Sequence, residues 1–155
     1  MSKILGISAG FHDAALSVVD TNGNILYAGH SERYSKIKND PLLNKHMVMQ
    51  VLDRYHPQHF AFYERPWMHN IQQIRSGQRH FGPWRTKSAV EQRLGLIVEG
   101  DVTFSSYSHH LSHAAAGFQT SPYDHAAVVV IDAIGEMDTI SVYNAYYDRE
   151  GRAHY

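Results

Sequence analysis

The sequence has no cysteine among its 155 residues. Disulfide bonds and thiolate metal sites are therefore excluded, and any metal must be held by His, Asp or Glu. No apolar stretch approaches the ~20 residues of a membrane-spanning helix, and the N-terminal apolar run is too interrupted by glycine for a signal peptide. We expect a cytoplasmic protein with no membrane partner.

An excess of charge of either sign is also missing. The chain has 14 basic and 15 acidic residues and a formal net charge of -1. A nucleic-acid partner usually requires a basic face, so nucleic-acid binding is not expected. Histidine, in contrast, is abundant, with 12 residues, and the length suits one domain with a substantial core.

Two of these histidines have the spacing of metal ligands. Small and apolar residues over 108–118 predict a short helix, in which His109 and His113 lie four residues apart. Such positions share one helix face, so both imidazoles could bind one divalent cation. The candidate third ligand is Asp132, at the end of the apolar run 126–132, which predicts a buried strand. Two His and one carboxylate suit Fe(II), zinc or manganese, although a histidine-rich sequence also produces such pairs by chance.

The N-terminal residues predict a strand, a turn and a hairpin. Strands are expected over 3–8, 14–20 and 25–31, with Asn22-Gly23 as the tight hairpin turn. His12 lies in the first turn, where a side chain can reach a ligand and accept a proton. A local hydrogen bond between His12 and Asp13 is the alternative from these residues alone.

The middle of the chain alternates helices and strands. Its predicted elements are a helix that starts at 41 or 44 and ends before Pro57, a strand over 60–64, helical segments over 71–75 and 90–98, and a strand over 101–107. Glu64 lies at a strand end, where ligands bind in α/β sheets, or it pairs with Arg65 or Arg75.

The C-terminal residues repeat the N-terminal pattern. A strand over 126–132, a turn at Gly135, a strand over 139–146, a turn over 148–151 and a new start at 152 indicate an internal duplication. We expect this second sheet to have two strands and no covering helix.

These motifs resemble the O-carbamoyltransferases of nodulation-factor and antibiotic biosynthesis, a family related to the universal tRNA threonylcarbamoyl-transfer enzyme. Residues 109–114, 126–132 and 10–15 carry the resemblance, together with Gly135-Glu136. It implies an α/β fold of the duplicated actin-like ATPase (ASKHA) type. Residues 1–125 would form the first lobe, and residues 126–155 the opening strands of a truncated second lobe.

The resemblance also implies a reaction. A carbamoyl group would pass from carbamoyl-adenylate, made from carbamoyl phosphate and ATP, to a hydroxyl of a small-molecule acceptor. His12 would be the general base, while His109, His113 and Asp132 would hold the metal, with Fe(2+) preferred. The implied substrate-binding residues are Glu32, Arg33, Lys38 and Glu64, and the implied nucleotide-binding residues are Gly10 and Gly135.

Two other functions fit the same sequence. One is tRNA threonylcarbamoyladenosine synthesis, which the near-neutral charge disfavours. The other is a non-catalytic metal- or nucleotide-binding fragment, or a subunit of a split enzyme whose fold a second polypeptide completes.

Overall fold

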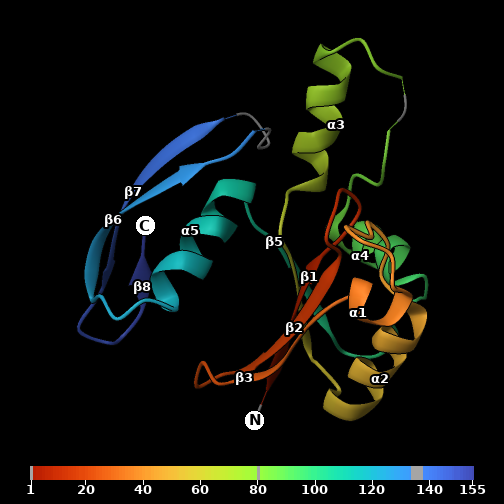
Figure 1. Ribbon diagram of the computed structural model, residues 1–155, viewed down its shortest axis with the longest axis horizontal. Coiled ribbons are helices and arrows are strands. Elements are labelled where there is room, and N and C mark those ends of the chain that lie inside the picture. Colours follow the sequence, from red (N-terminus) through yellow and green to blue (C-terminus); the bar gives the residue numbers. More distant parts are fainter. Residues whose placement is uncertain (1, 80, 134–137) are drawn as a thin grey trace.

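The computed structural model describes residues 2–79, 81–133 and 138–155. Within these residues the strands form two sheets, with helices packed against each (Figure 1). The first sheet has the order β3 (Ile25–His30), β2 (Ala15–Asp20), β1 (Lys3–Ser8), β4 (His59–Phe62), β5 (Thr103–Ser106). The second has the order β6 (His125–Ile131), β7 (Ile140–Tyr147), β8 (Ala153–His154). The predicted α/β class is confirmed.

The first sheet is mixed. β1, β2 and β3 pair antiparallel, whereas β4 and β5 join β1 in parallel. At the hairpin between β2 and β3, the Asp20 carboxylate accepts hydrogen bonds of 2.9 Å from the N–H groups of Asn22 and Asn24. Gly23 adopts a positive φ of 83°, which glycine tolerates without steric cost. The predicted strand, turn and hairpin order of the N-terminus is therefore confirmed.

The strand register places the core on one face of this sheet. Leu5 pairs with Val18 and Phe60, so their side chains point to the same side. Helices α2 (Lys45–Tyr55) and α4 (Thr86–Leu94) cover that side and bury Met47 and Val90 completely. Burying each large apolar side chain contributes about 1.5–3 kcal/mol, so these helices are held chiefly by the sheet.

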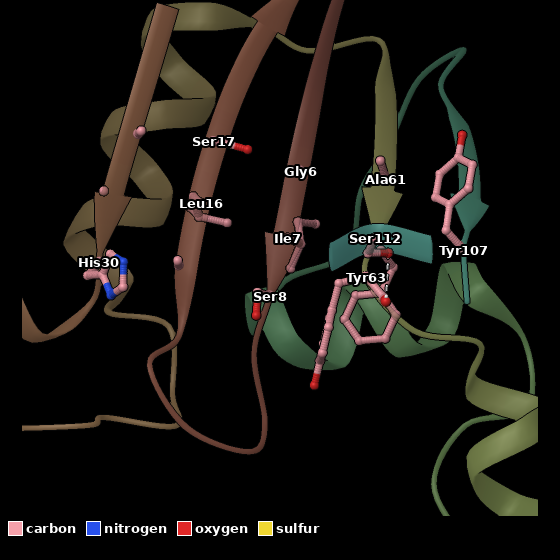
Figure 2. A pocket seen from close by; sticks show the side chains of 14 residues that line it. Gly6, Ile7, Ser8, Leu16, Ser17, His30, Ala61, Tyr63, Tyr107 and Ser112 are labelled. Carbon is pink, nitrogen blue, oxygen red and sulfur yellow. Dashed lines mark hydrogen bonds between the residues drawn. The ribbon is translucent and has the colours of Figure 1, made fainter. Parts of the chain in front are cut away.

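The opposite face of the first sheet carries small residues. Gly6 pairs with Ser17 on one side and with Ala61 on the other, and a Cβ at Gly6 would lie 2.6 Å from the Ser17 Oγ. These residues form the floor of a hollow of about 380 Å³, with Tyr63 at its wall (Figure 2). The Ser112 hydroxyl donates to the Tyr63 carbonyl at 3.0 Å, which ties helix α5 (His109–Gln119) to the end of β4.

Helix boundaries follow local capping. α2 begins after Asn44, whose side chain accepts from the N–H groups of His46 and Met47, as expected for an N-cap. α3 (Pro66–Arg75) starts five residues before the predicted segment, because proline is well suited to the first helical turn. α4 covers 86–94 instead of 90–98, because Gly95 ends it with a φ of 70°. The short helix α1 (Glu32–Ser35) is not predicted by the sequence.

The expectation of a two-stranded, uncovered second sheet is wrong. β8 adds a third strand, and α5 packs on one face, with the Phe118 ring stacked on Tyr147 at 5.0 Å between centroids. Figure 1 shows α5 between the two sheets. The other face exposes apolar side chains of β6 and β7: Val129, Ile131, Ile140 and Val142. Among the residues described, no helix has the length and apolar character needed to cross a membrane.

Candidate metal centre and cavity

Helix α5 has two distinct faces. Its Ser108 N-cap accepts a hydrogen bond from the Leu111 N–H at 3.3 Å and starts the helix. Residues on one face are buried against the second sheet: His110, Ala114 and Phe118. Residues on the neighbouring face line a cavity: His109, His113 and Gly117. Because the helix repeats every 3.6 residues, the residues that pack on the sheet and the residues that line the cavity lie on different faces.

The structure brings the three predicted metal ligands together. The Asp132 Oδ2 lies 2.6 Å from the His109 Nε2 and 3.5 Å from the His113 Nε2, and the two imidazole nitrogens are 3.1 Å apart. The Asp132 N–H donates to the Thr139 carbonyl at 2.8 Å, which anchors the residue where β6 ends. One ligand atom from each residue therefore points to a common centre.

This donor set fits a divalent cation. Metal–ligand bonds of about 2.0–2.2 Å place neighbouring ligand atoms about 2.8–3.6 Å apart in tetrahedral or octahedral sites. The separations of 3.1 Å and 3.5 Å lie in that range. The 2.6 Å contact is a hydrogen bond between His109 and Asp132, which a cation would replace with a small opening of the pair.

The charges at this site favour the ligand forms of these side chains. Burial opposes ionisation of Asp132, but the hydrogen bond and charge of His109 outweigh it, so the pKa of this carboxyl lies below its ordinary value. Burial, followed by repulsion from His109, lowers the pKa of His113. Since metals bind carboxylate and neutral imidazole, both shifts favour metal binding at neutral pH.

His110 connects the helix to the second sheet. Its side chain is 5% exposed, and its Nδ1 shares a hydrogen bond of 2.6 Å with the Ser141 hydroxyl on β7. The Nε2 atom is buried and has no hydrogen-bond partner within the described part of the chain. His110 therefore holds α5 against the sheet and does not join the ligand cluster.

The candidate ligands His109, His113 and Asp132 line a cavity of about 580 Å³ that is also lined by His12. The His12 Nδ1 and the Asp13 Oδ2 are 2.9 Å apart, and the His12 side chain is 60% exposed. When Nδ1 donates to Asp13, Nε2 carries the lone pair and can accept a proton. The local hydrogen bond and a role in proton transfer are thus compatible.

The other predicted site residues divide into two groups. Gly10 and Glu64 line the cavity. The Gly10 N–H donates to the Pro41 carbonyl at 2.8 Å, so this amide is already occupied and does not face a phosphate. Its assignment to nucleotide binding stays a prediction.

The remaining residues lie elsewhere. Arg33, at 79% exposure, contacts the Glu32 carboxylate at 3.8 Å, and Glu32 also accepts from the Asn39 N–H. Neither they nor Lys38 are among the described residues that line the cavity. Their assignment as substrate contacts therefore gains no support from the cavity, and Gly135 lies outside the described residues.

The polar cavity residues that were not predicted from the sequence include three on helices, namely His69 and Gln72 of α3 and Arg93 of α4. They reach the cavity because their helices pack beside it. No motif or spacing within α3 or α4 indicates this position.

Fold and site together define a mixed α/β protein with a candidate centre of two histidines and one carboxylate in a cavity. Residues 77–152 match the family model described as carbamoyltransferase N-terminus. The matched range contains Arg93 and the three candidate metal ligands. This match supports a relation to the carbamoyltransferases over the second half of the chain.

A curated relative extends the similarity to most of the chain. Uncharacterized protein sll1178 of Synechocystis sp. (strain ATCC 27184 / PCC 6803 / Kazusa) is 28% identical over 170 residues. The alignment covers 93% of this chain and 27% of the relative. The chain thus spans about a quarter of the length of that protein, whose name assigns no activity.

Proposed function

We propose that the protein is an O-carbamoyltransferase that acts on a hydroxyl of a small-molecule acceptor. The family match supports a carbamoyltransferase, and the single observation that carries the finer proposal is the shared cavity of His12 and the His109, His113 and Asp132 cluster. A proton acceptor beside a metal centre suits acyl transfer to a hydroxyl.

The proposed reaction breaks one bond and forms one. The acceptor oxygen attacks the carbamoyl carbon of carbamoyl-adenylate, which is made from carbamoyl phosphate and ATP. The bond from that carbon to the phosphate oxygen breaks, and the phosphate leaves with the electron pair. The acceptor proton passes to the His12 Nε2, and Asp13, 2.9 Å from Nδ1, stabilises the imidazolium that forms.

The metal would be held by His109, His113 and Asp132. A divalent cation there would act as a Lewis acid that offsets developing negative charge. We propose Fe(II), with zinc or manganese as alternatives for the same donor set. Glu64 is the proposed substrate contact, since it lines the same cavity.

The two sheets support an actin-like duplication. β1, β2 and β3 form an antiparallel meander, and β6, β7 and β8 form a second one. We assign residues 1–125 to the first lobe and 126–155 to the start of the second. α5 comes from the first lobe in sequence but packs on the second sheet, so the cavity lies where the lobes meet.

The test is carbamate formation by the metal-loaded protein supplied with carbamoyl phosphate, ATP and a panel of small hydroxyl compounds. We expect His12→Ala to lower the transfer rate about 10²- to 10⁴-fold, because general base catalysis is lost, with metal content unchanged. His46→Ala, an exposed histidine on α2, is the matched control. A wild-type rate in His12→Ala would remove the assigned base. Metal retention without any carbamate would leave a metal-binding module and contradict the transferase.

A further inference from the structure

Arg93 is a cation without a described counterion in the candidate active site. It lies on α4, is half-buried, and lines the cavity that holds the metal cluster. Within residues 2–79, 81–133 and 138–155, no carboxylate forms an ion pair with its guanidinium. Its guanidinium donors are therefore available to an anionic ligand that enters the cavity.

The guanidinium is held against the first turn. A Cβ at Gly10 would lie 2.3 Å from the Arg93 Cζ and 2.5 Å from both terminal nitrogens. Gly10 has a φ of 104°, which favours glycine, and its missing side chain leaves room for the planar group. The Gly10 N–H is bonded to Pro41, so Arg93 supplies the hydrogen-bond donors at this wall of the cavity.

The charge of the cavity changes with the metal. Its described charged residues are Arg93 and the carboxylates Glu64 and Asp132. With a divalent cation bound and the histidines neutral, one net positive charge is left. The loaded cavity therefore attracts an anion, and the planar fork of arginine donors matches a phosphate better than a lysine would.

We propose that Arg93 binds a phosphate group in this cavity. The phosphate binding rests on the position of Arg93 and on the charge of the metal-loaded cavity, whereas the identity of the phosphate as the leaving group of the carbamoyl donor rests on the proposed function. When the bond between carbon and phosphate oxygen breaks, negative charge grows on that phosphate. The Arg93 N–H groups stabilise this charge by hydrogen bonds in a partly water-excluded site.

Inorganic phosphate is the probe, titrated calorimetrically into the metal-loaded protein. We expect Arg93→Gln to weaken phosphate binding about 10- to 100-fold, the value of a charged hydrogen-bonded contact, with one metal still bound per chain. Arg93→Lys keeps the positive charge but loses the planar set of guanidinium donors, so its phosphate affinity should lie between those of the wild type and Arg93→Gln. Arg85→Gln is the matched control, since Arg85 is exposed at the start of the same helix and does not line the cavity.

Wild-type phosphate affinity in Arg93→Gln, or no phosphate binding by the loaded wild type, would overturn this proposal. If Arg93→Gln does not fold, the phosphate affinity of Arg93→Lys is the test instead. A wild-type phosphate affinity in Arg93→Lys would then overturn the proposal. Phosphate binding that depends on Arg93 in a protein that forms no carbamate would support the anion site and contradict only the proposed function.

Discussion

Two aspartates show how neighbouring groups decide what a carboxylate does. Asp132 is oriented by His109 and lies among metal-ligand donors. Asp148 instead accepts from the Arg152 Nε at 2.9 Å and lies 2.9 Å from the His154 Nε2 in the turn between β7 and β8. The bond to His154, followed by the Arg152 N–H, holds the pKa of Asp148 well below its usual range. Asp132 is thus positioned to bind a cation, whereas Asp148 stabilises the turn between β7 and β8.

The lowered pKa of Asp148 predicts a pH dependence of stability. Its ionised form stabilises the folded state above the unfolded pKa of about 4, and this contribution is lost as the pH falls through the lower folded pKa. Asp148→Asn should therefore lower the thermal midpoint more at pH 7 than at pH 2. Asp53→Asn, an exposed carboxylate on α2, is the control and should show little difference. Equal effects of Asp148→Asn at both pH values would contradict the assignment.

For single residues, the sequence predicts those site residues whose position follows from the helix or strand in which they lie. His109 and His113 share a face because a helix repeats every 3.6 residues, and Asp132 follows a strand whose apolar run is visible in the sequence. Arg93 could not be predicted, because its contact with Gly10 joins residues far apart in the chain. The isolation of Glu32 from the cavity likewise depends on how α1 packs.

Among the helices and strands, α5 both packs on the second sheet and carries two of the candidate metal ligands. Phe118 is buried to 1% exposure and contacts Tyr147 and Tyr155, while His110 bonds to Ser141 on β7. These contacts fix the helix on the second sheet, in which β7 pairs with β6, the strand that leads into Asp132. The sequence predicts the helix from its small and apolar residues, but not its place on the second sheet, because β-sheet packing is set by tertiary contacts.

Removing the Phe118 ring should loosen this arrangement. Phe118→Ala leaves a cavity under α5 and should lower the free energy of unfolding by about 3–5 kcal/mol, measured by urea denaturation. Metal affinity should fall as well, since His109 and Asp132 are aligned through this packing. Ala116→Ser, exposed on the same helix, should change stability by less than about 0.5 kcal/mol. Full stability in Phe118→Ala would show that the ring is not part of the core.

At the scale of the whole molecule, the cavity draws on both sheets. The candidate metal ligands come from α5 and the end of β6, whereas His12 follows β1, Glu64 follows β4 and Arg93 lies on α4. The internal repeat of strand and turn signals predicts the order of nearly all strands. It does not predict the helix on the second sheet, because the pattern shows which segments form strands and not what covers them.

The central claim is that one cation binds to His109, His113 and Asp132, and metal content measures it directly. Anaerobic equilibrium dialysis against Fe(II), with zinc and manganese in parallel, should give one ion per chain for the wild type and for His46→Ala. His113→Ala should bind at least about 10-fold more weakly because it removes one of three ligands, and Asp132→Asn should do the same because it removes the negative charge of the carboxylate ligand. One ion per chain, bound with wild-type affinity in His113→Ala, would contradict the account.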